Sequence, residues 1–308
     1  HAILHLLYSR FFTKGINYCN KTINLSEPFK NLFTQGMVCH ETYKDEDGNW
    51  LYPEEIEKTS NKSAIKKSDK KKVHIGQAES MSKSKKNTID PEIMISQYGA
   101  DSVRWFILSD SPPDKDIQWS NIGVASSNKF LQKIWDLNSK ILSRKESNNN
   151  TQETNYFNLK IQTLISKINN SIEEFKFNVT IAHFYETYKV FNKYLNADVS
   201  DKSLVLNITK IMKLMVPFTP HLAYECLELL KCDTPNKWPE IKDNVLEEIK
   251  FAIQVGGKTR DIILVKKDLN KEKINEIVFK SSKAKKYIED KKILKTIFVK
   301  NKIINYIL

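Results

Sequence analysis

The feature that most constrains the fold is a helical spacing of apolar residues that runs almost without interruption from residue 121 to about residue 230. Apolar residues that recur every three or four positions lie on one face of a helix, and that face must be buried against another element. Polar breaks divide the run into helices that we expect at 121–143, 157–174, 179–195, 202–215 and 220–230. Helices joined by short breaks pack as antiparallel neighbours, so the pattern predicts a helical bundle in residues 121–248. Thr219, which precedes a proline, is expected to cap the last helix.

The first 120 residues combine helical and strand patterns. The apolar spacing predicts a helix at 1–14, and short apolar runs predict buried strands at 32–38 and 73–76. Residues 43–72 are polar and end in a lysine- and serine-rich stretch. This composition indicates a surface insertion with little core of its own.

We predict a small α+β module in residues 249–308. Strands are expected at 251–255, 260–265 and 296–299, with a glycine hairpin turn between the first two and a helix at 271–287. Residues 250–308 contain 16 lysine and arginine residues and 6 acidic ones, so they carry most of the chain's net charge of +12. A basic module on a nearly neutral body suits a phosphate-backbone partner. Because nearly all the basic residues are lysine, the charge alone also fits a compositional bias.

Membrane, disulfide-rich and metal-binding classes are not favoured. No apolar run approaches the roughly 18 residues of a membrane span. The four cysteines lack C-x-x-C spacing, which favours a reduced, cytoplasmic setting over a disulfide scaffold. His1 and His5 lie four positions apart on an expected helix. No third ligand is evident near them, so we predict no metal site.

Residues 80–87 have no apolar periodicity and are expected to form an exposed loop before a helix that starts at Pro91 and is capped by Asp90. Several ammonium and hydroxyl groups on such a loop can close over a polyphosphate and neutralise the charge that grows on a leaving pyrophosphate. A lysine suits this task because its point charge is carried on a long stem. From the residues alone, a loop of serine and lysine is more often a solvated linker, a basic localisation tract or a phosphorylation target.

Residues 81–120 resemble, over forty positions in order, the signature region of the class I aminoacyl-tRNA synthetases. In that family a Lys-Met-Ser-Lys-Ser loop precedes a helix, a Tyr-Gly-Ala-Asp segment and an arginine-containing helix. The resemblance implies that residues 1–120 are the C-terminal half of a Rossmann-like, parallel-sheet catalytic domain. It also implies an ATP-binding loop made of Ser80, Met81, Ser82, Lys83 and Ser84. Ser80 replaces the motif's first lysine, so Lys83, which matches the second, is the principal catalytic candidate.

Other segments resemble the leucyl-tRNA synthetases in particular. The first 14 residues are similar to a segment of that family that lines the leucine pocket, which implies that role for His5, with His1 beside it. Residues 32–38 (LFTQGMV) are similar to a strand near the adenosine. The adenine neighbours implied by this match are Gln35, Gly36, Met37 and Val38. Gly36 is expected to let the backbone approach closely.

The tail resembles the terminal domain of the bacterial leucyl-tRNA synthetases. The match begins at residues 251–260 (FAIQVGGKTR) and implies that Lys258 and Arg260 lie on a tRNA-facing hairpin. The position and rough length of the polar insertion also match an insertion of that family. The bundle at 121–248 resembles the helical, anticodon-binding-type domain that class I synthetases use against tRNA.

The resemblance implies an aminoacyl-tRNA ligase of translation. With ATP and Mg²⁺ as the substrate complex, leucine would be activated to leucyl-adenylate and transferred to tRNA(Leu). The half of the nucleotide fold with the His-x-Gly-His-type motif is missing here, as is the editing domain. We therefore expect the chain alone to be inactive and to need the missing N-terminal half as a partner. A valyl- or isoleucyl-type synthetase fragment and a non-catalytic, synthetase-derived tRNA-binding protein remain as alternatives.

Overall fold

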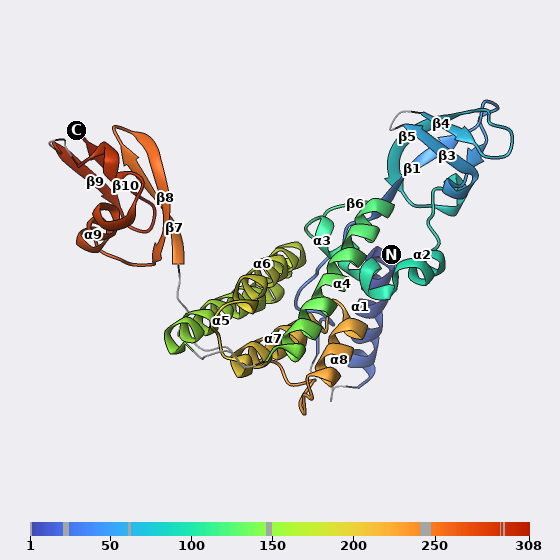
Figure 1. The fold of residues 1–308 in the computed structure, drawn as a ribbon. Coiled ribbons are helices and arrows are strands. Elements are labelled where there is room, and N and C mark those ends of the chain that lie inside the picture. Colours follow the sequence, from blue (N-terminus) through green and yellow to red (C-terminus); the bar gives the residue numbers. More distant parts are fainter. Residues whose placement is uncertain are drawn as a thin grey trace. The chain divides into compact units, whose positions relative to one another are not determined.

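The structure, a computed structural model, describes residues 2–20, 25–60, 63–145, 150–240, 248–289, 291 and 293–308 (Figure 1). The chain divides into two units. One comprises His1–Lys145, Lys167–Asn196 and Leu204–Pro239, and the other comprises Glu146–Ser166, Ala197–Ser203 and Glu240–Leu308. Each unit is described by itself.

The helices expected from the apolar spacing are confirmed. They are α4 (Asn121–Ser143), α5 (Thr151–Glu173), α6 (Phe177–Leu195), α7 (Asp201–Met215) and α8 (Pro220–Leu229). Helix α5 begins earlier than the expected residue 157, because Asn150 Oδ1 accepts the backbone N–H groups of Gln152 and Glu153 at 3.0 and 3.1 Å. An asparagine cap within a polar run leaves no apolar signal. The buried apolar residues of α4 recur at helical spacing: Val124, Phe130, Leu131, Ile134, Leu137 and Ile141.

Helix α3 (Ala100–Asp110) joins the signature region to these helices through one fully buried side chain, Trp105. Its ring centroid lies 5.4 Å from that of Phe130 on α4 and 5.8 Å from that of Phe184 on α6. Its indole N–H donates to the Tyr185 hydroxyl at 3.3 Å. The sequence analysis did not single out this tryptophan, because one large residue in an apolar helix gives no separate signal. Trp105 is therefore the centre of this junction.

A carboxylate on α3 caps α8. Asp101 accepts the backbone N–H of Leu222 at 2.7 Å and the ring Nδ1 of His221 lies 3.0 Å from its other oxygen. The Arg104 guanidinium donates to the carbonyls of residues 217–218 at 2.6 and 3.1 Å. Thr219 is the N-cap residue of α8, as expected, and its carbonyl accepts the Ala223 N–H at 2.9 Å, but its side chain makes no cap hydrogen bond. A carboxylate at the positive end of a helix satisfies donors that otherwise lack partners.

The first sheet has the order β2-β1-β5-β4-β3, and every pair along that path is antiparallel. Its long strands are β1 (Val38–Lys44) and β5 (Lys72–Ser80). Its other strands are β2 (Trp50–Leu51), β3 (Ile56–Ser60), β4 (Ser63–Lys66) and β6 (Ile117–Gln118). The expectation of a parallel sheet is wrong for these strands. Among the described residues, β6 and β1 form the parallel pair of this sheet.

Two further expectations about this region are wrong. The strand expected at 32–38 begins only at Val38, and Met37 is 54% exposed. The insertion at 43–72 has its own core, in which five buried side chains pack together: Tyr43, Leu51, Ile56, Ala64 and Val73. These residues are widely spaced in a polar stretch, so no local run revealed them. The strand expected at 73–76 is confirmed as the middle of the longer β5.

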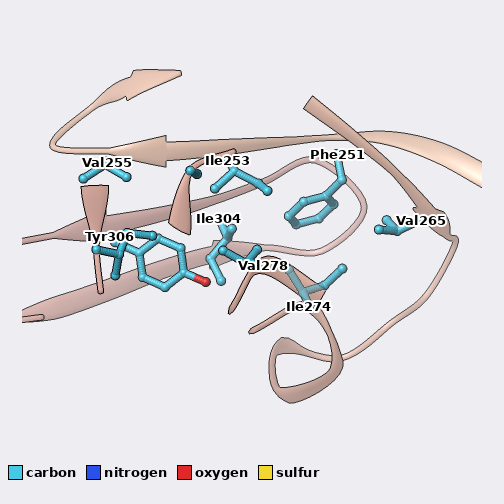
Figure 2. Packing of buried hydrophobic residues seen from close by; sticks show 10 residues of the cluster. Phe251, Ile253, Val255, Val265, Ile274, Val278, Ile304 and Tyr306 are labelled. Carbon is cyan, nitrogen blue, oxygen red and sulfur yellow. The ribbon is translucent and has the colours of Figure 1, made fainter. Parts of the chain in front are cut away.

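The C-terminal module is a four-stranded sheet, order β8-β7-β10-β9, packed on one face by helix α9 (Lys271–Ser281). Its strands are β7 (Glu248–Val255), β8 (Lys258–Lys266), β9 (Lys295–Val299) and β10 (Ile303–Ile307). Strand β10 was not predicted, although it lies at the centre of the sheet and runs parallel to β7. Figure 2 shows the buried side chains, among them Phe251, Ile274 and Tyr306, that form its core. The helix expected at 271–287 ends at Ser281, and a short 3₁₀ turn follows at Lys285–Tyr287.

Segment 113–116 is packed tightly against Gly36. The Gly36 N–H donates to the Pro113 carbonyl at 2.8 Å, and a Cβ added at Gly36 would lie 1.9 Å from the Lys115 carbonyl oxygen. The Met37 N–H donates to Asp116 Oδ1 at 2.8 Å. The close approach that Gly36 permits in this structure is therefore to another part of the chain.

Replacing Asp101 with alanine should lower the free energy of unfolding by about 1–3 kcal/mol, because the α8 donors lose a buried acceptor. Urea denaturation of the purified chain measures this. Asp110→Ala, an exposed acid at the end of the same helix, should change stability by less than about 0.5 kcal/mol. Equal effects of the two substitutions would contradict the capping role.

Replacing Gly36 with alanine should also destabilise the chain, by about 1–3 kcal/mol, because a backbone carbonyl must move to admit the methyl group. Gly15→Ala is the matched control, since a Cβ there meets no atom within 4 Å. Within a helix this control should stabilise by about 0.5–1 kcal/mol. Thermal unfolding of both variants compares them, and an unchanged Gly36→Ala midpoint would refute the packing described.

Candidate functional site

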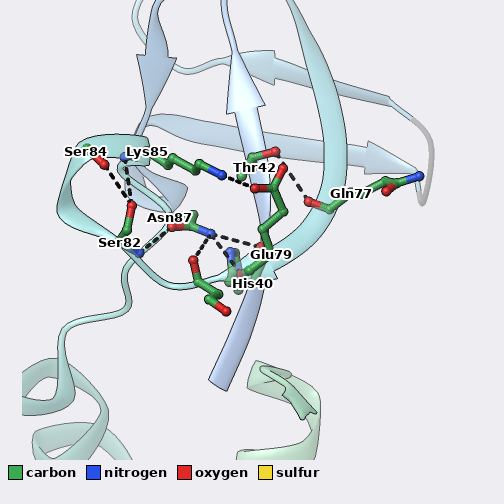
Figure 3. Close-up of polar contacts among 9 residues, drawn as sticks. His40, Thr42, Gln77, Glu79, Ser82, Ser84, Lys85 and Asn87 are labelled. Carbon is green, nitrogen blue, oxygen red and sulfur yellow. Dashed lines mark hydrogen bonds and ion pairs between the residues drawn. The ribbon is translucent and has the colours of Figure 1, made fainter. Parts of the chain in front are cut away.

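The lysine-rich loop lies between the end of β5 at Ser80 and the start of helix α2 (Pro91–Tyr98) (Figure 3). Lys83 begins a short 3₁₀ turn, Lys83–Lys85, and its side chain is exposed. The expectation of an exposed loop is confirmed for that part. It is wrong for Asn87, which is fully buried at 0% exposure.

Asn87 ties the loop to the sheet. Its Oδ1 accepts the Ser82 N–H at 2.8 Å. Its Nδ2 donates to the carbonyls of His40 and Glu79 at 3.1 and 3.2 Å and lies 3.5 Å from that of Ser80. Figure 3 draws these contacts converging on one side chain between β1 and β5. The amide therefore closes residues 82–87 into a ring at the end of the sheet.

Contacts inside this ring shape its backbone. The Ser82 hydroxyl accepts the Lys85 N–H at 3.3 Å and lies 3.0 Å from the Ser84 hydroxyl. Lys86 has a φ of +52° and donates its N–H to the Lys83 carbonyl at 3.3 Å. A left-handed residue after a short turn reverses the chain direction. This reversal carries the backbone back to Asn87.

The three lysines of the loop differ in what their ammonium groups contact. Lys85 forms an ion pair with Glu79. The Lys86 nitrogen lies 5.2 Å from the ring centroid of Tyr52, over the insertion. Among the described residues, the Lys83 ammonium makes no hydrogen bond or ion pair. Lys83 is therefore the loop lysine whose charge is available to a ligand.

The four expected adenine neighbours lead directly to this loop. The Val38 carbonyl accepts the Met81 N–H at 3.1 Å, so residues 35–38 meet the start of the loop. Gln35 and Met37 have exposed side chains. The structure thus joins Val38 to the start of the expected phosphate loop, with Gln35, Gly36 and Met37 just before it in the chain.

A hollow of about 590 Å³ lies on β1 and is lined by His40, Glu41, Lys58 and Trp119, among others. Burial lowers the pKa of His40, so its ring is neutral at pH 7. Burial opposes ionisation of Glu41, but hydrogen bonds from Lys58 and Tyr43 outweigh it and lower the pKa of that carboxyl. The hollow therefore presents a neutral imidazole and a compensated ion pair. The sequence analysis assigned no role to these residues.

Of the two expected leucine-pocket histidines, His5 is described by the structure and does not contact the loop. His5 is exposed on helix α1 (Ala2–Cys19) and stacks on Phe29, with 6.1 Å between the ring centroids. Within the described part of the chain, no hydrogen bond, ion pair or ring contact connects His5 with residues 80–87. His1 lies outside the described residues. Large apolar side chains of α1 are exposed around His5: Leu4, Leu7, Tyr8, Phe11, Phe12 and Ile16.

The two expected tRNA-facing residues lie on β8 of the C-terminal module. Lys258 and Arg260 are both exposed. The Arg260 guanidinium lies 4.4 Å from the ring centroid of Tyr287, and the Lys286 ammonium lies 5.2 Å from the same ring. This aromatic ring with two cations was not predicted, because Arg260 is distant in sequence from Lys286 and Tyr287.

Among the described residues, no three or more histidine, cysteine, aspartate or glutamate side chains come together in a way that could hold a metal ion. None of the helices described is long and apolar enough to cross a membrane.

Two family models match the chain. The model of the class I tRNA synthetases (I, L, M and V) matches residues 72–120, which include the loop and α3. The model of the anticodon-binding domain of tRNA ligase matches residues 154–275. The first match therefore contains Lys83 and Asn87, and the second contains Lys258 and Arg260.

Curated leucine–tRNA ligases are similar in sequence to this chain along its whole length. That of Zymomonas mobilis is 37% identical over 100% of this chain and 36% of its own length. That of Rickettsia massiliae is 39% identical over 99% of this chain and 37% of its own length. The chain thus spans about a third of these relatives.

A solved structure gives the same result for the fold. In the LeuRS–tRNA–LeuAMS ternary complex of Agrobacterium radiobacter K84, the synthetase matches with a TM-score of 0.67 and 25% identity. The match covers 100% of this chain and 37% of that one. Over its whole length the chain is thus similar in sequence and structure to leucyl-tRNA synthetases, and residues 72–120 match the model of the class I tRNA synthetases.

Proposed function

We propose that this chain is the part of a leucine–tRNA ligase that supplies the ATP-phosphate loop and the tRNA-facing regions. The complete enzyme would activate leucine with ATP and Mg²⁺ and transfer it to tRNA(Leu). The observation that carries the proposal is the Lys83 ammonium, exposed and unpaired among the described residues, on a loop whose base is fixed by a buried amide. The names of the relatives support leucine as the amino acid.

Lys83 acts electrostatically in this proposal. The leucine carboxylate attacks the α-phosphorus of ATP, the bond to the bridging oxygen breaks, and pyrophosphate leaves with the electron pair. Negative charge grows on the β- and γ-phosphates as that bond breaks. A lysine ammonium already placed beside them stabilises the transition state more than the ground state. Mg²⁺ enters as part of the ATP substrate. Ser80, Met81, Ser82 and Ser84 complete the loop around the phosphates.

Residues 35–38 receive the adenine in this proposal. Their exposed Met37 side chain offers apolar surface beside the start of the loop. The Met37 N–H is already used by Asp116, so it is not the group that reads the adenine edge. Gln35, with its exposed amide, supplies polar contacts. Gly36 keeps the backbone close to segment 113–116 and so fixes the position of this strip.

The leucine side chain would be enclosed jointly by His1, His5 and the N-terminal half of the enzyme. The exposed apolar side chains around His5 support a contact with that missing half, because an apolar patch of this kind is rarely left open to water. His5 alone is too exposed to form a pocket. The four cysteines are free, which supports the cytoplasm as the compartment.

The tRNA would contact the helical region and the basic tail. We propose domains at 1–120, 121–248 and 249–308, with the last two facing tRNA. The anticodon-binding family match and the excess of basic residues in 250–308 support this assignment. Arg260 and Lys286 beside the Tyr287 ring offer charge and a stacking surface to a nucleotide.

Lys83→Ala tests the catalytic assignment in the enzyme completed by its N-terminal part. Leucine-dependent ATP–pyrophosphate exchange should fall about 10²–10³-fold in kcat, the loss typical of one transition-state charge donor. Binding of tRNA should be unchanged. Lys129→Ala, an exposed lysine on α4, is the matched control and should retain full exchange.

Other outcomes separate the alternatives. Exchange with valine or isoleucine instead of leucine would identify a different branched-chain synthetase. Unchanged exchange in Lys83→Ala would remove the catalytic assignment. Intact tRNA binding without any exchange in the native completed enzyme would favour a non-catalytic tRNA-binding protein, for which Ser80 in the loop is the motivating departure. The chain by itself should show no exchange.

A further inference from the structure

We propose that Asn87 is a positioning residue that holds the loop in the conformation that presents Lys83 to a ligand. It is not a catalytic residue, because its polar atoms all face the protein backbone. The proposed role of Asn87 is to fix the conformation of the loop. Its link to ATP rests on the function proposed above.

Every polar group of the Asn87 side chain has a hydrogen-bond partner. A side-chain amide has two donors and one acceptor oxygen. All of them are used, although the side chain is fully buried. The acceptor takes the Ser82 N–H from the loop, and the donors reach carbonyls of His40 on β1 and Glu79 on β5. His40 and Glu79 are partners in the β1–β5 ladder. Asn87 therefore connects the loop to both β1 and β5, close to the residue at which the loop begins.

Few other side chains could make these hydrogen bonds at position 87. Aspartate has the same shape but no N–H groups, and its charge would face the carbonyl oxygens of residues 40, 79 and 80. Alanine would leave those buried groups and the Ser82 N–H without partners. Each unsatisfied buried group is costly, so the loop would leave the sheet to regain hydrogen bonds with water.

The other side-chain contact that links the loop to β5, an ion pair, is weak. The Lys85–Glu79 ion pair also links the loop to β5, but its side chains are 39% and 44% exposed. Exposed ion pairs contribute little, because solvent screens them. The buried amide is therefore the dominant constraint on the loop. Glu79→Gln, which removes the charge of this pair and keeps its length, is a matched control.

Limited trypsin digestion of the purified chain, followed by mass spectrometry, tests the positioning directly. Trypsin cleaves after Lys83, Lys85 and Lys86 only when the loop opens. Asn87→Asp should raise the cleavage rate at these sites about tenfold or more, and leave the rate at sites in α4 unchanged. Glu79→Gln and Asn196→Asp, an exposed asparagine after α6, should resemble the native chain. Unchanged loop cleavage, or equal acceleration at all sites, would overturn the proposal.

If the Asn87→Asp variant does not fold, hydrogen exchange of the native chain tests the positioning of the loop instead. Hydrogen exchange of the native chain should protect the Ser82 amide, which donates to Asn87, more than the Ser84 amide by about tenfold or more. Equal exchange of the two amides would overturn the proposal.

Kinetics in the completed enzyme connect the positioning to function. Asn87→Asp should raise KM for ATP and lower kcat while leaving KM for leucine unchanged. A general structural defect would change both KM values. If Lys83→Ala has no effect but Asn87→Asp opens the loop, the proposed function fails and the positioning stands. If Lys83→Ala abolishes exchange but Asn87→Asp neither opens the loop nor changes KM for ATP, the positioning fails alone.

Discussion

The arrangement of the candidate site depends on one buried amide, that of Asn87, which holds the lysine-rich loop at the end of the β1–β5 ladder. A loop that carries several ammonium groups repels itself and gains entropy by opening. Hydrogen bonds from a fully buried side chain oppose that tendency more effectively than exposed ion pairs do. Lys83 is consequently both exposed and confined, as a group that meets a highly charged ligand must be.

The strands that support the loop, β1 and β5, form one sheet with the strands of the insertion, so the insertion and the candidate site are structurally coupled. Strand β5 forms part of the insertion sheet and ends at the loop, while Tyr52 of the insertion lies near the Lys86 ammonium. On the other side of the loop, α3 is anchored to neighbouring helices by the Trp105 ring and the Asp101 carboxylate. These contacts on the two sides of the loop limit how far it can move.

The sequence predicted the helices well because a helix spaces its buried residues every three to four positions, and α4 does so along its whole length. It predicted the exposed loop that carries Lys83 through charge and resemblance, whereas the catalytic role of Lys83 stays a prediction. It failed for the antiparallel sheet, because strand direction and pairing are set by distant contacts. Asn87 and Asp101 were missed as structural residues, since a buried polar side chain leaves no periodic pattern. The core of the insertion, including Leu51, was hidden among polar neighbours.

The proposal that the Lys83 ammonium meets the triphosphate of ATP is tested most directly by the protection of individual lysines from chemical modification. The enzyme completed by its N-terminal part would be acetylated briefly with and without ATP and Mg²⁺, and the modification of each lysine measured by mass spectrometry. Lys83 is expected to be modified readily without nucleotide and to be protected strongly by it, whereas Lys129 should be unaffected. Equal modification of Lys83 with and without saturating ATP would contradict the account, because the ammonium would then not meet the triphosphate.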